Sequence, residues 1–176
     1  MPAAAQRSFD VLLSLKPDDV TALVYSHDAW LQLDQIETAH QRLEQAHTLA
    51  PDDFRVLLRL VNQRCQRRLV SGKDGEITLK LINTTLRLVP QSAEAHHKLA
   101  CYHLLRDEQT QAKTLMQRFI EHHPKHPYVL YFYAQVLFRL GEVQMAADAI
   151  MLCYEFGWCG REICRALCGI LPAAGR

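Results

Sequence analysis

Glycine is scarce in this chain, with 7 glycines among 176 residues. Apart from Gly72 and Gly75, all of them lie at or after residue 141. Sheets built of short strands need frequent turns that contain glycine, so the scarcity favours helices over a β-sandwich.

Long apolar runs are also missing, because no segment approaches the roughly 18 consecutive apolar residues of a membrane-spanning helix. The first residues lack the charged stretch and continuous apolar core of a signal peptide, since Asp10 interrupts the apolar pattern. We therefore expect no membrane insertion and a cytoplasmic location.

Neither sign of charge dominates, because 20 Lys and Arg stand against 19 Asp and Glu. Such a chain exerts no overall field that attracts nucleic acid or anionic lipid, so charged recognition has to come from local patches. The apolar share of 49% is typical of a globular protein and excludes a disordered tail.

Four prolines recur at a regular interval, namely Pro17, Pro51, Pro90 and Pro124. The first and third gaps are 34 residues long, and the middle gap is 39. We assign the five extra residues to a turn-forming loop at 71–75, with the sequence SGKDG. A recurring interval of this length indicates an internal structural repeat.

Each proline ends a stretch with one apolar pattern. A small residue precedes it by twelve positions, a large apolar residue by eight, and a small or apolar residue by five. These spacings place all three on one face of a helix that ends at the proline. The sets are Ala5, Phe9 and Leu12; Ala39, Leu43 and Ala46; Thr78, Ile82 and Thr85; and Ala112, Met116 and Phe119.

A further helix is predicted after each proline. Asp53 and Ser92, in PDD and PQS, are suited to cap the N-termini of two of these helices. In the last unit Gly141 is suited to the left-handed turn that closes the first helix of a pair. There, Gly157 and Trp158 take the place of the proline, after Ala146 and Ile150 at the repeating positions.

These features resemble the tetratricopeptide repeat (TPR) family over residues 2 to about 158. The resemblance implies an all-α fold, a right-handed α-solenoid of antiparallel helix pairs with about four repeats and terminal capping helices. We expect a single domain over 1–176, with a leading helix at 2–15, repeats at about 18–51, 52–90, 91–124 and 125–158, and a terminal helix at 160–171. A repeat cannot bury its apolar face alone, so stacking supplies the core.

Three positions depart from the family pattern. Ser26 and His27 stand where the family usually has leucine and glycine, and Thr78 replaces the usual alanine. The second repeat is therefore expected to be the most irregular. The leading helix fits the second half of a repeat, so it caps the array, belongs to a longer array, or has its missing surface supplied by a partner.

Histidines and cysteines raise the question of a metal. His122, His123 and His126 cluster near a helix C-terminus, where histidine is favourable without a metal. The cysteines lie mostly in helical apolar patterns, and paired C-x-x-C motifs are absent. We therefore expect reduced, packed thiols rather than a zinc site, and no cofactor. The cysteines considered for zinc are Cys153, Cys159, Cys164 and Cys168.

No enzyme motif is present in the sequence. It contains no glycine-rich phosphate loop, no nucleophile elbow and no H-E-x-x-H helix. We therefore expect no catalytic residues and a non-catalytic protein.

In the TPR family, the first helix of each pair lines a concave groove that accepts a peptide or a partner helix. The resemblance assigns this groove to Tyr25, Asp28, Arg55, Arg59, Asn62, His97, Lys98, Tyr128, Phe132 and Gln135. The same assignment includes Val24, Leu58 and Cys101. Arg59 and Lys98 are expected to be neighbours and, with Arg55, to form a basic spot for a carboxylate. Tyr128, Tyr131 and Phe132 are expected to form an aromatic shelf for apolar anchors.

The function that we predict is a scaffold or adaptor that binds an acidic and apolar segment of another protein, with terminal helices that could mediate a dimer. One alternative is a bacterial secretion-type chaperone that holds a segment of a secreted or assembling protein. The other is an RNA-binding helical array. The closing prolines, the 34-residue period and the balanced charge speak against RNA, because RNA binders need a basic face.

Overall fold

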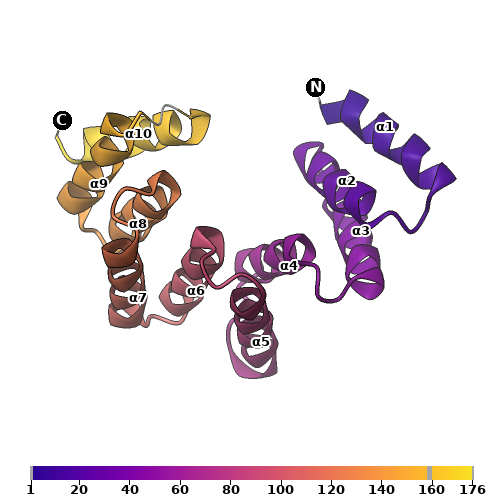
Figure 1. Ribbon diagram of the computed structural model, residues 1–176, viewed down its shortest axis with the longest axis horizontal. Helices are drawn as coiled ribbons and strands as arrows, with labels where there is room; N and C mark the ends of the chain where they lie inside the picture. The colour runs from indigo at the N-terminus through magenta and orange to yellow at the C-terminus, as the bar shows by residue number, and fades with distance from the viewer. Residues whose placement is uncertain (1, 158–159, 176) are drawn as a thin grey trace. The chain divides into compact units, whose positions relative to one another are not determined.

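The computed structural model describes residues 2–157 and 160–175, and within these ranges it contains ten α-helices and no strand (Figure 1). The predicted all-α class is therefore confirmed. The chain divides into two compact units, one up to Gln63 and one from Arg64 onward. Each unit is described by itself, and the predicted repeat boundaries stay a prediction. No helix in the described ranges is long and apolar enough to cross a membrane.

The first unit contains α1 (Pro2–Leu15), α2 (Val20–Gln32), α3 (Ile36–Leu49) and most of α4 (Phe54–Gln66). Helix α2 packs against both α1 and α3. The interior of this unit holds Leu23 and Leu43, both 0% exposed.

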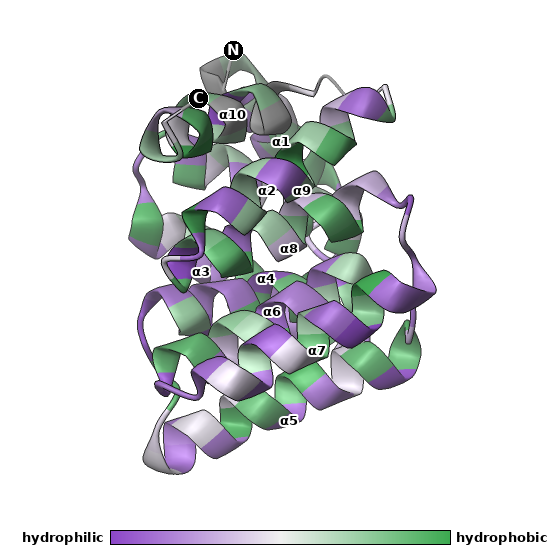
Figure 2. Ribbon diagram, turned by 90° about the vertical axis from the view of Figure 1, so that its left-hand side faces the viewer, coloured by the Kyte–Doolittle hydropathy of each residue, from purple (hydrophilic) through white to green (hydrophobic). Residues whose placement is uncertain are grey.

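The second unit begins at the end of α4 and continues with α5 (Gly72–Leu88), α6 (Ala93–Leu105), α7 (Gln109–His122), α8 (Pro127–Arg139), α9 (Val143–Glu155) and α10 (Arg161–Ala173). Helices α6 and α7 pack as one pair and α8 and α9 as another, with α10 against α9. Figure 2 shows hydrophobic and hydrophilic residues alternating along these helices, as expected where each helix buries one face.

The repeating small position is fully buried in the second helix of each pair. Ala39, Thr78, Ala112 and Ala146 are all 0% exposed. The large residues four positions later are buried as well, at 0 or 1% exposure: Leu43, Ile82, Met116 and Ile150. The face that the register predicts to be packed is therefore confirmed for these helices. In α1 the outcome differs, because Ala5 is exposed and Leu12 is 38% exposed.

Four turns share one backbone conformation. The residue two positions after α2, α4, α6 and α8 has a positive φ: Asp34 (60°), Arg68 (56°), Asp107 (61°) and Gly141 (79°). The next amide donates back to a carbonyl five residues earlier, as in Gln35 to Trp30 at 3.0 Å and Glu142 to Leu137 at 3.0 Å. This is the Schellman motif, which ends a helix through one left-handed residue. The prediction for Gly141 is confirmed.

Two predicted helix caps are also confirmed. The Asp53 carboxylate accepts from the Val56 amide at 3.4 Å, and the Ser92 hydroxyl accepts from the Ala95 amide at 3.2 Å. Gly157 has a φ of 81° just after α9, which agrees with its predicted role as a helix end. Trp158 lies outside the described residues.

The predicted loop at 71–75 is wrong, because α5 already begins at Gly72. The extra residues lengthen this helix to 17 residues instead of forming a loop. Gly75 explains how the helix fits, since a Cβ at this position would lie 2.5 Å from the carbonyl oxygen of Val70. Only glycine allows so close an approach of the two backbones.

Thr78, which replaces the usual alanine of the family, lies in α5 beside the same connection between α4 and α5. Its hydroxyl donates to the carbonyl of Leu69 at 2.6 Å, and Arg64 Nε donates to that hydroxyl at 2.8 Å. The departure from the family pattern therefore comes with a buried polar network that holds the α4–α5 connection.

The cysteines divide into two groups. Cys65, Cys101 and Cys153 are buried, as predicted. Cys164 and Cys168 of α10 are exposed, so the prediction that they pack inside the protein is wrong. The physical reason is that their part of α10 faces outward, away from the side that packs on α9. Cys159 lies outside the described residues.

Candidate functional site

A pocket of about 580 Å³ lies between α6 and α8 in the second unit. Its walls come from the first turns of α6 and from α8 with the residue before it. Five predicted groove residues meet there: His97, Lys98, Tyr128, Phe132 and Gln135. The remaining lining residues are Ala93, Glu94, His126 and Tyr131.

Aromatic rings form one side of this pocket in a continuous row. Tyr128 and Phe132, four residues apart on α8, have ring centroids 6.2 Å apart and stack at 27°. Phe132 in turn stacks on His97 of α6, at 4.4 Å and 8°. Tyr131 contacts Phe132 with centroids 5.3 Å apart, and both side chains are half-buried. The predicted shelf residues therefore lie together, with His97 as an additional member.

His97 is the most unusual group in the pocket. It is only 6% exposed, and its Nε2 lies 3.3 Å from Cys101 Sγ. Burial lowers the pKa of His97 to about 3, so the imidazole is neutral near pH 7. Its Nδ1 is buried and has no hydrogen-bond partner among the described residues. A buried polar atom in this state favours any ligand group that can bond to it.

Cys101 was also predicted to line the groove, but it is not among the residues that line this pocket, and it is 7% exposed. Arg139 Nη1 donates to its sulfur at 3.6 Å. The thiol therefore contacts both His97 and Arg139. The sequence could not show that it is buried, because an i, i+4 spacing fixes proximity along a helix and not depth.

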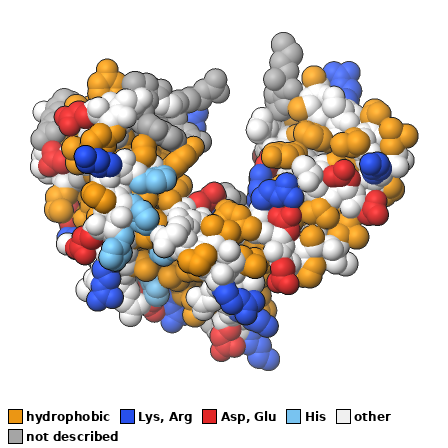
Figure 3. Space-filling view, in the orientation of Figure 1, with side chains coloured by type: hydrophobic (Ala, Val, Ile, Leu, Met, Phe, Trp, Pro, Cys, Tyr) orange, Lys and Arg blue, Asp and Glu red, His pale blue; other side chains and the backbone are white. Residues whose placement is uncertain are grey.

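A second pocket, of about 560 Å³, lies between α6 and α7. His96 stacks on Phe119 at its edge, with ring centroids 4.0 Å apart. His122 also lines it, while His123 bonds through Nε2 to Gln91 at 2.8 Å. Figure 3 shows histidine side chains gathered on the surface of the second unit. Sequence analysis missed this pocket because it interpreted His122 and His123 only as helix-terminal residues.

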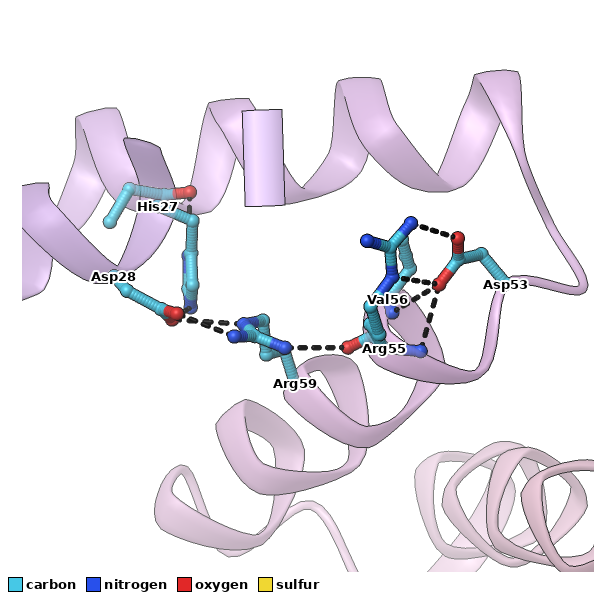
Figure 4. Close-up of polar contacts among 7 residues, drawn as sticks. His27, Asp28, Asp53, Arg55, Val56 and Arg59 are labelled. Atoms are coloured by element: carbon cyan, nitrogen blue, oxygen red, sulfur yellow. Dashed lines mark hydrogen bonds and ion pairs between the residues drawn. The ribbon is translucent and has the colours of Figure 1, made fainter. Parts of the chain in front are cut away.

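In the first unit, Asp28 of α2 and Arg59 of α4 form a two-pronged ion pair (Figure 4). Arg59 Nε lies 2.9 Å from Asp28 Oδ1, and Nη2 lies 2.5 Å from Oδ2. A guanidinium and a carboxylate in this parallel arrangement form one of the stronger polar contacts in proteins. Arg59 therefore already has a carboxylate partner within its own unit.

Arg55 is engaged in the same way. Its Nη2 lies 2.8 Å from Asp53 Oδ2, and its Nη1 donates to Thr21 Oγ1 at 3.3 Å. The Arg55 side chain also lowers the pKa of the Asp53 carboxyl by hydrogen bonding. The basic spot expected from these two arginines is thus balanced by Asp53 and Asp28. Arg59 and Lys98 belong to different units, so their expected proximity stays a prediction.

The other predicted groove residues of the first unit differ in how far their side chains are buried. Tyr25 is 47% exposed and stacks on Phe9, with centroids 6.2 Å apart, and Asn62 is half-buried. Val24 and Leu58 are wrong as groove positions, because they are 0% and 7% exposed and belong to the core. Their faces turn inward, where apolar side chains gain most from burial.

No family model matches this sequence, and no curated protein matches it. Solved structures do match it. A tetratricopeptide repeat protein from Parabacteroides merdae has a TM-score of 0.79 at 15% identity, over 98% of this chain and 66% of that chain. A thermophilic TPR protein of Thermus thermophilus has a TM-score of 0.77 at 16% identity, over 97% of this chain and 90% of that chain.

A third match is PilW, a type IV pilus biogenesis factor, with a TM-score of 0.71 at 15% identity, over 99% of this chain and 79% of that chain. All three matches cover nearly the whole of this chain. The chain therefore has the TPR fold, and the resemblance found in the sequence is confirmed for the fold.

Proposed function

We propose that this protein is a non-catalytic interaction module that binds an extended peptide or a helix of a partner protein. The observation that carries the proposal is the α6/α8 pocket, where a row of aromatic rings, a cation and an unsatisfied buried imidazole nitrogen meet. Pockets that combine an apolar wall with a few polar groups are the usual form of a binding site.

The aromatic wall selects the apolar part of the ligand. Tyr128 and Phe132 share one face of α8, so a leucine or aromatic side chain can lie against both rings. Buried aromatic contacts of this kind carry much of the affinity in protein interfaces.

The polar groups of the pocket determine which polar residues of the ligand lie beside the apolar anchor. Lys98 supplies a positive charge at the rim for an acidic residue of the ligand. The neutral His97 supplies one hydrogen-bonding atom deeper inside. In the first unit Asp28 and Arg59 form an ion pair with each other, whereas Lys98 lines the pocket together with the aromatic wall, so the acidic residue is expected at Lys98.

A peptide selection tests this proposal directly. The whole chain is used to select binders from a library of random peptides displayed on phage, and the enriched peptides are measured by calorimetry. We expect an acidic residue near a leucine or aromatic residue in the enriched set. Phe132→Ala is expected to weaken their binding at least about tenfold, which is typical of a central anchor.

Matched controls lie elsewhere in the second unit. Lys98→Glu is compared with Lys80→Glu on α5, and Phe132→Ala with Tyr154→Ala on α9, since Lys80 and Tyr154 are exposed away from the pocket. Binding should fall only for the pocket variants, and circular dichroism should be unchanged for all four. Equal losses at Lys80 or Tyr154 would refute the pocket as the binding site.

A cytoplasmic location goes with this proposal. The buried thiols of Cys65, Cys101 and Cys153 are suited to a reducing compartment, as the sequence also suggested.

A further inference from the structure

The pocket between α6 and α7 is separate from the proposed peptide site. Its volume of about 560 Å³ lies within the range of small-molecule sites. Its walls come from one side of α6 and one side of α7, and none of its residues lines the α6/α8 pocket. The second unit therefore contains a further cavity whose ligand has to be inferred from its own side chains.

Two rings and an aliphatic side chain form the apolar part of this pocket. His96 stacks on Phe119 at 4.0 Å and 13°, and the half-buried Leu115 lies one turn before Phe119. The Nδ1 of His96 lies 2.9 Å from the carbonyl oxygen of Ser92, so Nδ1 carries the proton and donates. Burial lowers the pKa of His96, so the ring is neutral near pH 7. His96 therefore contributes an uncharged ring, and such a wall favours an aromatic ligand.

The charge on the pocket wall has one sign. Among the nine described residues that line the pocket none is acidic, and Arg118 supplies a permanent cation. Arg118 is exposed and makes no ion pair or hydrogen bond with any residue that the structure describes. Near the other end, Glu108 lies 2.6 Å from His103 Nδ1, and Arg106 neutralises this carboxylate from 2.8 Å. The ligand group that fits beside Arg118 is therefore an anion.

We propose that the α6/α7 pocket binds a small aromatic carboxylic acid, with its ring against the apolar wall and its carboxylate at Arg118. A guanidinium offers two parallel N–H donors that match the two oxygens of a carboxylate. The ring gains from burial against Leu115, His96 and Phe119. Both parts of the ligand are needed, because a neutral ring leaves Arg118 unpaired and a bare anion leaves the apolar wall in water. The proposal does not depend on the α6/α8 pocket.

1-Naphthaleneacetate is a probe with both parts, and NMR locates where it binds. The whole chain is labelled with ¹⁵N and titrated with the probe, and the shifts of the backbone amide signals are followed. We expect a Kd of about 1 mM or tighter, as for other ligands of this size, with the largest shifts at His96, Leu115 and Phe119. 1-Naphthaleneacetamide has the same shape without the charge and should bind at least about fivefold more weakly. Acetate alone should not shift these amides.

Two variants test the assigned roles. Arg118→Gln removes the cation, so it should weaken binding of 1-naphthaleneacetate at least about fivefold and hardly change that of the neutral amide. Thr114→Trp fills the pocket and should abolish binding of both compounds. Arg118 and Thr114 are exposed, so both variants should keep their helicity and melting temperature. Arg87→Gln is the matched control, because Arg87 is exposed on α5 and does not line the pocket, and it should bind like the unaltered chain.

Each of several outcomes would overturn the proposal. The first is the absence of shifts at the pocket amides with about 10 mM probe, which is ten times the expected Kd. Equal affinity for the acid and its amide, or unchanged affinity of Arg118→Gln or Thr114→Trp for the acid, would also refute it. Shifts confined to Tyr128 and Phe132 would place the probe in the α6/α8 pocket and refute the α6/α7 site, while the peptide selection would still test the α6/α8 pocket by itself.

Discussion

The imidazole of His27 on α2 donates a hydrogen bond from Nδ1 to the carbonyl oxygen of Ala39 on α3, 2.9 Å away. A carbonyl can only accept, so Nδ1 carries the proton and the ring is held in one tautomer. Burial lowers the pKa of His27 and keeps the ring neutral. A histidine can thus stand at a position of close helix approach, because its ring uses the backbone of the neighbouring helix as a partner.

Acid should destabilise this protein through His27 and His97. Burial lowers the pKa of both, to about 3 for His97, whereas an exposed histidine titrates near 6.5. Below pH about 6.5 the unfolded chain takes up protons that the folded chain does not, so the free energy of unfolding should fall as pH drops from there. Each group contributes at most about 1.4 kcal/mol per pH unit. Urea unfolding at several pH values measures this slope.

His97→Phe is the control for the pH dependence. It keeps a ring against Phe132 but removes the titrating group, so its slope between pH 6.5 and 4 should be shallower. An identical slope in the variant would show that His97 does not contribute to the acid sensitivity.

Enlarging a buried small residue should destabilise the fold. Ala112→Leu and Ala146→Leu add three carbons at positions that are 0% exposed, so each should lower the free energy of unfolding by about 1–3 kcal/mol. Ala5→Leu is the matched control at the same position of α1, where the side chain is exposed, and it should leave the melting temperature nearly unchanged. Unchanged melting temperatures for Ala112→Leu and Ala146→Leu as well would contradict the register.

The Thr78 hydroxyl should contribute more to the free energy of unfolding than the Thr85 hydroxyl. Thr78→Val removes the acceptor of Arg64 Nε and should cost about 1–3 kcal/mol of unfolding free energy. Thr85 donates only to Leu81 of its own helix, at 2.7 Å, so Thr85→Val should cost clearly less. Chemical unfolding of the two variants compares them directly, and equal losses would mean that the Arg64 contact adds nothing.

Gly75→Ala should be destabilising although alanine is the better helix former. The added Cβ would lie 2.5 Å from the Val70 carbonyl oxygen, which is backbone and cannot move aside cheaply. Gly169→Ala, where a Cβ meets nothing within 4 Å, should be neutral or slightly stabilising. Melting temperatures distinguish the two, and a stable Gly75→Ala variant would contradict the close approach of α5 to residue 70.

Much of the helical architecture could be predicted from the sequence because burial follows the repeating pattern. Ala112 and Ala146 are 34 residues apart, Ala39 stands at the same position relative to its closing proline, and all three are 0% exposed, so the interior accepts only small side chains there. The helix N-cap at Ser92 could also be predicted, because an N-cap depends only on a residue and its near neighbours in the sequence.

The parts that could not be predicted depend on partners far apart in the sequence. Asp28 and Arg59 are 31 residues apart, and neither residue type reveals that they neutralise each other. The depth of Cys101 and the exposure of Cys168 follow from which helix faces find a neighbour. The loop at 71–75 was mistaken because GKDG is typical of a turn, whereas the close contact of Gly75 with Val70 favours helix.

The left-handed turns at Asp34, Arg68 and Asp107 also matter for protein engineering. A side chain in this conformation is strained by its own Cβ, and glycine at each turn should raise the free energy of unfolding by roughly 0.5–1 kcal/mol. Each of the three turns lies between helices and not on the pocket wall. A variant with glycine at all three turns would therefore be a more stable starting protein for directed evolution. Its extra stability would tolerate destabilising substitutions on α6 and α8 that change which peptides bind.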